Sequence, residues 1–270
     1  MRKIDRKIEK TWNLHLNPGT DHMNPTESPH FLGYYFIIGT MKSGTTSLYA
    51  YVTQHPSIVA ARRKELNTLV PWGLKGVSPP PPDFKKYIRD MAPEGFPSTP
   101  FMLGESSGYI NKPGSLNILR DLFPKARLIL SYRPAADRMA SFYRMMKTRK
   151  RYPDSVSFRD TYRKWLEGSR YHDAEHAQHL LSLFPREQIL VLTLNELQHD
   201  PQGTMQRVFK HLGLPPHQVD DLTPRNVTRK IPIPADQMRE CKLACEELDQ
   251  AVEKIWSLRL GTHSKTPDHP

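Results

Sequence analysis

The sequence predicts an α/β fold: a P-loop-like, three-layer domain in which a central parallel sheet is flanked by helices. Three observations predict it. Short runs that are apolar throughout alternate with helical patterns, which is typical of parallel sheets covered on both faces. The first of these runs leads into the glycine-containing turn "GTMKSG". The chain, at 270 residues, is also long enough to bury a large core.

Four runs are predicted to be buried strands because they are short, apolar and rich in β-branched or aromatic residues. They cover residues 34–38, 101–104, 127–132 and 188–194. Helical periodicity predicts helices over residues 44–54, 114–122, 134–148, 157–167, 171–183, 201–212 and 234–258. Pro134 and Pro201 stand near the start of two of them, where proline is tolerated.

The domain prediction places a polar tail at residues 1–30, a single domain at 31–260 and a disordered tail at 261–270. Within the domain, residues 71–100 contain eight of the chain's 25 prolines, including Pro79 to Pro82. This density predicts a long surface loop without regular elements, which is a candidate substrate lid.

Net charge and cysteine content limit the possible partners. A charge of +11 and a pI near 9.6 indicate an anionic partner, whether nucleic acid, acidic membrane, polyanionic glycan or nucleotide-like cofactor. The apolar run at 31–40 is too short to span a bilayer, so no membrane association is expected. Cys241 and Cys245 provide no disulfide framework, and we therefore expect a cytoplasmic protein.

The turn after the first strand resembles the phosphate-binding loop GxxxxGK[ST], but its lysine stands at a different position. Gly39 and Gly44 have the expected separation, but Thr45 occupies the lysine position and Lys42 lies inside the loop. Backbone N–H groups and a helix N-terminus still bind an anion in such a loop, because both depend on geometry.

Charged residues follow three of the predicted strands: Lys42, Glu105 and Arg133. Ligands of open parallel sheets bind beyond the carboxyl ends of the strands. We therefore expect these three side chains to converge on one edge of the sheet.

Four segments carry a resemblance to a known family. In order they read "IIGTMKSGTTSL", "GESSGYI", "LILSYRPAADRMASFY" and "FPREQILVLTLNELQHDPQGTMQRVFKHLGLP". They resemble the sulfotransferases that use 3′-phosphoadenosine-5′-phosphosulfate (PAPS), and within them the heparan sulfate branch. The resemblance covers residues 33 to about 230.

The resemblance implies a donor site for PAPS, with 3′-phosphoadenosine-5′-phosphate (PAP) as product. Lys42 would lie at the bridging oxygen, and Arg133 and Ser141 would bind the 3′-phosphate. An eight-residue separation places Ser141 two helical turns from Arg133, which is compatible with one shared phosphate. The implied donor-binding residues are Thr40, Met41, Lys42, Ser43, Gly44, Thr45, Thr46, Arg133, Ser141, Arg229 and Lys230.

The resemblance also implies roles at the acceptor. Glu105 matches the glutamate that acts as base in glycan-modifying members, and Lys64 matches a lysine that faces the acceptor. Trp72 is either an adenine-stacking residue or a packing residue. Tyr171 and His172 belong to an expected acceptor-site wall.

The face made by His172, His176 and His179 has helical spacing and could also hold a metal. We interpret it instead as a polar face or as an acceptor-site wall, because the family chemistry needs no metal.

We therefore predict a sulfotransferase acting on a hydroxyl or amine of a small-molecule acceptor. Met41, Ser106 and the missing cysteine-closed loop around 222–232 depart from the glycan enzymes, and no nucleic-acid partner is expected. The alternatives are a heparan-sulfate-like glycan acceptor, a nucleotide kinase of the same fold, and a non-catalytic polyanion-binding protein. Acceptor identity and oligomeric state stay open.

Overall fold

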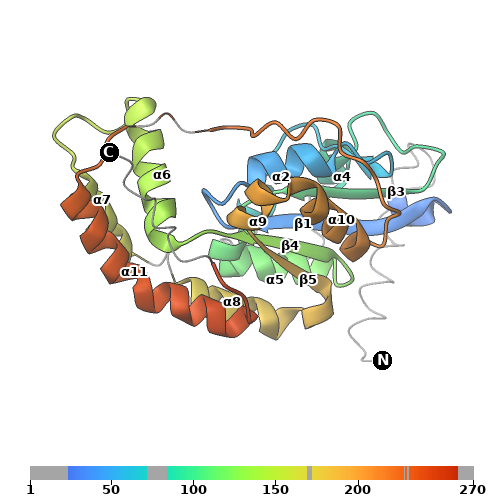
Figure 1. Ribbon diagram of the computed structural model, residues 1–270. Helices are drawn as coiled ribbons and strands as arrows, with labels where there is room; N and C mark the ends of the chain where they lie inside the picture. Colours follow the sequence, from blue (N-terminus) through green and yellow to red (C-terminus); the bar gives the residue numbers. More distant parts are fainter. Residues whose placement is uncertain (1–23, 72–83, 169–171, 228, 230, 261–270) are drawn as a thin grey trace.

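The computed structural model describes residues 24–71, 84–168, 172–227, 229 and 231–260. Within these residues a central sheet has helices on both faces (Figure 1). Its strand order is β2-β3-β1-β4-β5, and every pairing is parallel. The strands are β1 (Phe31–Gly39), β2 (Ile58–Val59), β3 (Phe101–Ser106), β4 (Arg127–Tyr132) and β5 (Ile189–Thr193). The predicted fold class is confirmed.

The predicted helices all form, with boundaries within two residues of those expected. They are α2 (Thr45–Val52), α5 (Pro113–Leu122), α6 (Ala135–Thr148), α7 (Phe158–Leu166), α8 (Asp173–Leu183), α10 (Pro201–Leu212) and α11 (Ala235–Trp256). The structure adds α4 (Phe84–Met91), α9 (Leu194–His199) and the 3-10 turns η1 (Pro25–Glu27), η2 (Tyr109–Asn111) and η4 (Arg186–Gln188).

The central strand β1 has both faces buried, which explains its continuous apolar sequence. Tyr35 and Ile37 pack against α2, α9 and α10, whereas Phe36 and Ile38 pack against α4, α5 and α8. Successive side chains of a strand point to opposite faces, so one apolar run serves two cores. This places β1, and the loop that follows it, at the centre of the molecule.

A third apolar cluster joins α6, α7 and α11 beside the sheet (Figure 1). It includes Met139 and Phe142 of α6, Trp165 of α7, and the buried Cys241 and Cys245 of α11. Because α6 begins directly after β4, this cluster holds α6 next to the carboxyl edge of the sheet. The carboxyl edge of the sheet and α6 therefore border the place where ligands of such sheets bind.

The prediction of an irregular loop over residues 71–100 is wrong for residues 84–91. Helix α4 occupies Phe84–Met91, and Tyr87, Ile88 and Met91 are buried in the same core cluster as Phe36 and Ile38 of β1. No proline falls between positions 83 and 92, so the local sequence permits a helix despite the surrounding prolines. Residues 72–83 lie outside the described part of the chain.

The two predicted tails fall largely outside the described residues, which begin at position 24 and end at 260. Residues 25–27, assigned to the polar tail, form η1, with Asn24 as its N-cap. Among the described helices, none has the length and apolar character needed to cross a bilayer.

Candidate anion-binding active site

A cavity of about 770 Å³ lies at the carboxyl edge of the sheet, between the loop after β1 and helix α6. Lys42 and Arg133, which follow β1 and β4, both line it, as the strand ends predict. Its described lining has one carboxylate, Glu65, and eight basic side chains. The basic residues are Lys42, Lys64, Lys112, Arg133, Arg138, Arg144, Arg149 and Arg225. Such a lining attracts a strongly anionic ligand.

Two glycines fix the course of the loop between β1 and α2. Gly39 has φ +135°, and a Cβ there would lie 2.6 Å from Cγ2 of Ile110. Gly44 has φ +78°, and a Cβ there would lie 2.6 Å from Cδ1 of Leu194. Both positions combine a backbone conformation that favours glycine with a close neighbour. The separation of these glycines in the sequence is therefore a requirement of the turn.

Hydrogen bonds tie the loop to the neighbouring strand β4. The backbone N–H of Thr40 donates to the carbonyl of Ser131 at 2.7 Å, and its Oγ1 contacts the same carbonyl at 2.9 Å. Ser131 Oγ in turn donates to the carbonyl of Ser43 at 2.7 Å. Thr40 and Ser43 are thus buried supports of the loop, although Thr40 also reaches the cavity lining.

Helix α2 directs its N-terminus into the cavity. Its N-cap is Gly44, which has no side chain to accept from the first helical N–H groups. Thr45, Thr46 and Ser47 of the first turn line the cavity. An uncapped N-terminus with adjacent hydroxyl groups is suited to a phosphate, through the N–H groups and the helix dipole together.

The side chain of Lys42 contacts helix α6. Its Nζ lies 3.6 Å from Sδ of Met145. Burial lowers the pKa of Lys42, and the charges of Arg149 and Arg133 lower it further. Crowded cations of this kind are stabilised by a bound anion.

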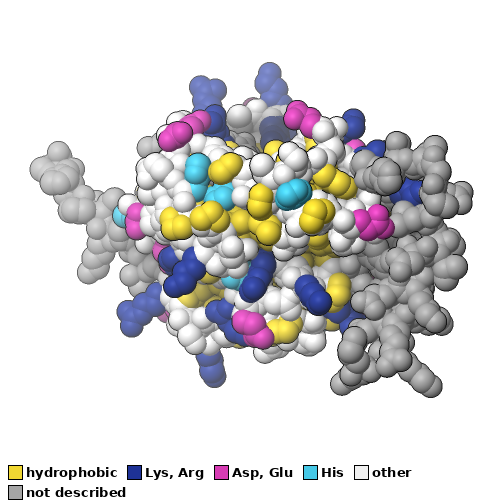
Figure 2. All heavy atoms as spheres, turned by 90° about the vertical axis from the view of Figure 1, so that its right-hand side faces the viewer, with side chains coloured by type: hydrophobic (Ala, Val, Ile, Leu, Met, Phe, Trp, Pro, Cys, Tyr) yellow, Lys and Arg dark blue, Asp and Glu magenta, His cyan; other side chains and the backbone are white. Residues whose placement is uncertain are grey.

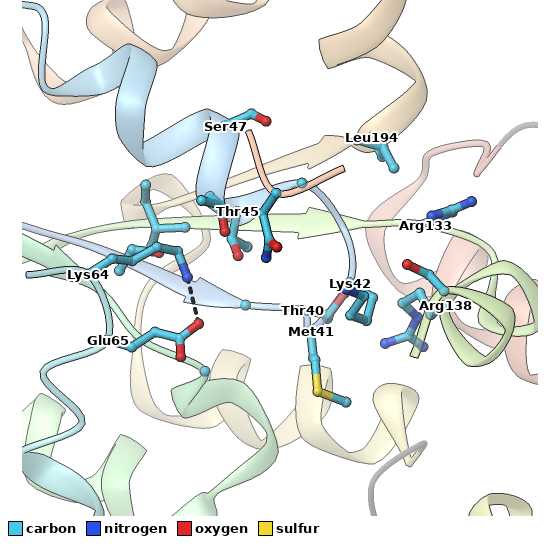
Figure 3. A pocket seen from close by; sticks show the side chains of 18 of the residues that line it. Thr40, Met41, Lys42, Thr45, Ser47, Lys64, Glu65, Arg133, Arg138 and Leu194 are labelled. Carbon is cyan, nitrogen blue, oxygen red and sulfur yellow. Dashed lines mark hydrogen bonds and ion pairs between the residues drawn. The ribbon is translucent and has the colours of Figure 1, made fainter. Parts of the chain in front are cut away.

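The structure brings Arg133 and Ser141 to the same cavity. Arg133 follows β4 and Ser141 lies on the second turn of α6, and both line the cavity. Figure 3 shows Arg133 on the side of the loop opposite Lys64. The Arg133 guanidinium lies 3.9 Å from the carboxylate of Asp137, and burial lowers its pKa. The geometry is compatible with two donors closing on one phosphate group.

The interpretation of Glu105 as a catalytic base needs correction. Glu105 has no exposed surface and is not among the described residues that line the cavity. Its carboxylate accepts from the hydroxyls of Tyr87 (2.5 Å), Ser107 (2.6 Å) and Tyr109, and from the backbone N–H of Leu66 (3.1 Å). Burial raises the pKa of Glu105, while these donors act in the opposite direction. The side chain therefore holds β3, α4 and the segment at 65–67 together.

The carboxylate that reaches the cavity is Glu65, which the sequence interpretation passed over. The backbone N–H of Glu65 donates to the carbonyl of Ser106 at 2.9 Å, which anchors the segment to the end of β3. Glu65 Oε1 pairs with Lys64 Nζ at 2.7 Å (Figure 3), and 60% of the Glu65 side chain is exposed. The dipeptide Lys64-Glu65 was the available signal, but only its lysine was assigned a role.

The segment after α10 closes the cavity above α2. Tyr51 Oη donates to the carbonyl of Leu222 at 2.8 Å, and the N–H of Arg225 donates to Ser47 Oγ at 2.9 Å. Pro224, Arg225 and Val227 consequently line the cavity beside Leu194. These residues were not predicted, because an irregular segment of this kind has no periodicity that would reveal its neighbours.

Several predicted site residues lie elsewhere. Trp72, Tyr171 and Lys230 are outside the described residues. Arg229 is exposed and is not among the described lining residues. His172 is also not among the described lining residues, and its Nδ1 pairs with Glu175 Oε2 at 2.9 Å; its role at the acceptor stays a prediction. No group of three metal-ligating side chains occurs among the described residues.

Comparison with known proteins agrees with this geometry. A family model described as a sulfotransferase domain matches residues 33–232. The chain belongs to the sulfotransferase family. The match contains the loop, Glu65, α6 and the closing segment, so the cavity lies within the family's own domain.

Individual relatives of this sulfotransferase are distant. It is 26% identical over 214 residues to human bifunctional heparan sulfate N-deacetylase/N-sulfotransferase 3, an alignment covering 68% of this chain and 22% of the relative. It is 32% identical over 111 residues to the membrane-associated sulfotransferase kil1 of Dictyostelium discoideum, covering 40% of this chain and 22% of the relative. The chain thus spans about a fifth of the length of these relatives.

A solved structure supports the fold of this sulfotransferase. The sulfotransferase from Alicyclobacillus acidocaldarius superposes with a TM-score of 0.67 and 23% sequence identity, over 85% of this chain and 96% of the other. At this identity the similarity establishes the three-layer α/β fold.

Proposed function

We propose that this sulfotransferase transfers a sulfuryl group from PAPS to a hydroxyl or amine of an acceptor. One observation carries the proposal. A single cavity joins the loop and N-terminus of α2, which are suited to one phosphate, to Arg133 and Ser141, which are suited to a second. PAPS is a nucleotide with anionic groups at both its 5′ and 3′ positions, whereas ATP lacks the 3′-phosphate.

The donor's 5′ end would bind at the loop. The N–H groups at the start of α2 and the hydroxyls of Thr45 and Thr46 hold the 5′-phosphate, and Lys42 lies beside the bridging oxygen. The wall formed by Ser47, Leu194 and the segment 224–227 is a candidate for the adenine, because these residues line the described cavity. Leu194 and Val227 offer apolar contact to the base.

We propose Glu65, in place of Glu105, as the group that accepts the acceptor's proton. Glu65 lines the cavity, and its charge acts on Lys42 by raising the pKa that burial lowers. An acceptor hydroxyl or amine placed between Glu65 and the loop would attack sulfur as the bond from sulfur to the bridging phosphate oxygen breaks. Its proton passes to the Glu65 carboxylate, which thereby acts as a general base.

Lys42 would neutralise the charge that builds on the departing phosphate. Preorganised cations and N–H groups are most effective where charge develops during the reaction. Because burial and neighbouring arginines lower the pKa of Lys42, the growing negative charge on the leaving group favours its protonated form. Lys64, paired with Glu65, keeps that carboxylate oriented at the acceptor side.

For the acceptor we propose a small molecule, with a glycan as the second candidate. Lys64, Lys112 and Asn67 line the cavity and offer hydrogen-bond donors to either class. Relatives whose names specify heparan sulfate N-sulfotransferase activity support the glycan. A screen with labelled donor decides between them. It should contain small phenols, alcohols and amines, together with oligosaccharides that carry unsubstituted glucosamine.

Calorimetry tests the donor assignment directly. The wild-type protein should bind PAP more tightly than adenosine 5′-phosphate, because only PAP carries the second phosphate. ATP with magnesium should bind no better than adenosine 5′-phosphate. Equal affinity for PAP and adenosine 5′-phosphate would overturn the proposal.

A further inference from the structure

Arg138 enters the cavity wall from the same face of α6 as Ser141. The residues of α6 that line the cavity are Arg138, Ser141, Arg144 and Met145, whose spacing of three and four residues defines one helical face. Arg138 and Ser141 are therefore neighbours on the helix, and Arg133 precedes its first turn. Figure 3 shows Arg133 and Arg138 on the same side of the loop, opposite Lys64 and Glu65.

The Arg138 side chain is fixed by an acidic residue on another helix. Asp173, the first residue of α8, accepts from both terminal nitrogens: Nη1 lies 3.4 Å from Oδ1, and Nη2 donates to Oδ2. The Arg138 and Asp173 side chains are 3% and 4% exposed. Two parallel contacts between a guanidinium and a carboxylate determine the orientation of the whole planar group.

A buried ion pair of this kind contributes little net stability, because the loss of hydration offsets the attraction between the charges. A guanidinium held rigidly in the wall of an anion-binding cavity has a different use. It meets a phosphate without losing side-chain entropy at the moment of binding.

The charges around Arg138 also indicate an anion at this end of the cavity. The pKa of Arg133 is lowered by burial and then by the positive charges of Arg144 and Arg138, with Asp137 acting in the opposite direction. Three guanidinium groups thus influence one another across a small space. A phosphate group placed among them would replace this repulsion with attraction.

We propose that Arg138 is a third ligand of the donor's 3′-phosphate, beside Arg133 and Ser141, and that Asp173 is the positioning residue that orients it. The proposal rests on the proposed function, since it assigns a further residue to the same donor site. Arg138 would supply specificity for a 3′-phosphorylated nucleotide.

The test is the ratio of the Kd for adenosine 5′-phosphate to the Kd for PAP, measured by calorimetry. The main variant is the double substitution Arg138→Met with Asp173→Leu. Replacing both partners of a buried ion pair by apolar residues of similar volume is often neutral for stability, so this variant should fold. The ratio should fall roughly 10–100-fold, the effect of removing a hydrogen bond to a charged group.

Asp173→Asn tests the positioning role separately, because it keeps Arg138. Its thermal unfolding is measured first, since an unpaired buried charge destabilises a protein. In the folded protein the ratio should fall by a smaller factor, and the KM for PAPS should rise while kcat stays near the wild-type value. Arg159→Met with Glu240→Leu is the control. It removes an arginine–carboxylate pair between α7 and α11, 2.6 Å long, whose members do not line the described cavity.

The outcomes are distinguishable. If the wild-type protein has no preference for PAP, the proposed function itself fails. If the wild-type prefers PAP and Arg133→Ala loses that preference, but the Arg138→Met/Asp173→Leu variant keeps it, Arg138 is no ligand and the inference is overturned. A folded Asp173→Asn protein with the wild-type ratio and KM would overturn the positioning role. A lowered ratio in the control would also count against the inference, because the effect would not be local.

Discussion

At the scale of single residues, the side chains proposed to bind the donor line the cavity, whereas other side chains hold the surrounding segments in place. Arg133 and Lys42 line the cavity and are crowded by other cations, whereas Ser131 and Glu105 are buried and hydrogen-bond to neighbouring segments of the fold. Substitutions in the two groups should therefore differ in kind. The first should change affinity or turnover, and the second should change stability.

Arg133→Ala is expected to weaken PAP binding by about 2–4 kcal/mol, the range for removing one partner of a desolvated charge pair. Binding of adenosine 5′-phosphate should change far less, because that ligand lacks the 3′-phosphate. Calorimetry with both ligands measures the effect. The exposed Arg120 of α5, which is not among the described lining residues, serves as the control position: Arg120→Ala should leave both affinities unchanged. A similar loss for both ligands would contradict the assignment.

Glu65→Gln is expected to lower kcat roughly 10²–10⁴-fold, the usual contribution of general base catalysis. PAP affinity should stay near wild type, because the amide keeps the size of the side chain. Steady-state kinetics at saturating donor and acceptor, with calorimetry for PAP, measure both quantities. An enzyme that retains most of its turnover would move the base to another residue.

Glu105→Gln is the matched comparison for that variant. An amide places two donors where the carboxylate accepts from Tyr87, Ser107 and Tyr109, so we expect a stability loss of about 1–3 kcal/mol. Turnover of the folded fraction should change less than in Glu65→Gln. The opposite ranking of the two variants would restore Glu105 as the base.

At the scale of elements, α6 connects the proposed donor site to the helical cluster beside the sheet. Its N-terminus is capped from a distance: the N–H of Ala135 donates to Asp249 of α11, with Oδ1 at 2.9 Å and Oδ2 at 3.2 Å. Burial raises the pKa of Asp249 from 3.8 to about 6, although the Ala135 bond and Arg138 act in the opposite direction. The position of α6 is thereby linked to a titratable group.

The raised pKa of Asp249 predicts that the stability of the folded protein depends on pH. Between pH 4 and 6 the folded protein holds the Asp249 proton more tightly than the unfolded chain does. The stabilisation from Asp249 is therefore complete below about pH 4 and is lost as the pH rises to about 6, by at most about 3 kcal/mol.

Asp249→Asn should remove this part of the pH dependence, since the amide oxygen still accepts from Ala135 and carries no titratable proton. Urea unfolding between pH 4 and 7 measures it. The exposed Asp236 of the same helix provides the control, and Asp236→Asn should keep the wild-type profile over this range. An unchanged profile in Asp249→Asn would contradict the prediction.

At the scale of the whole molecule, the net charge of +11 is concentrated unequally. The end of the molecule away from α6 shows basic side chains interspersed with acidic and apolar ones (Figure 2). The cavity instead gathers eight basic side chains around one carboxylate. A nucleotide with two anionic ends fits this distribution better than an extended polyanion on the face that Figure 2 shows.

Donor binding should stabilise the whole fold, because it would bridge the α2 loop and α6. At a PAP concentration of about 100 times Kd, the gain is roughly 2.7 kcal/mol, and the Tm should rise on the order of 5–10 °C. A thermal-shift series compares PAP, ATP with magnesium and a DNA oligomer. An equal or larger shift with either of the last two would favour the kinase or the polyanion-binding alternative.

Catalysis should proceed without an added metal ion, because Lys42 and the N–H groups of the loop are placed to neutralise the leaving phosphate. Activity measured in excess chelator should equal activity in untreated buffer. Activity that disappears with chelator and returns with magnesium or zinc would contradict this expectation.

The amino-acid sequence by itself determined the layered α/β architecture and the loop and helix that form the proposed donor end of the cavity. Strands that are apolar throughout and helices with one apolar face require a sheet covered on both sides, so β1, β3, β4 and β5 were predictable from local pattern. Gly39, Lys42 and Gly44 were predictable too, since one loop contains them. Arg133 and Ser141 could also be predicted to lie close together, because one follows β4 and the other lies on the helix that begins next.

Only the tertiary structure decided which carboxylate reaches the cavity. Glu105 and Glu65 both come near the end of β3, but Glu105 is the last-but-one residue of a buried strand and faces Tyr87 and Tyr109. Glu65 lies on an irregular segment whose course depends on its bond to Ser106. The pairing of Arg138 with Asp173 and the approach of Arg225 to α2 likewise join residues 35 and 178 positions apart in sequence. Local sequence patterns do not predict such contacts, because the contacts form only when separate elements pack together.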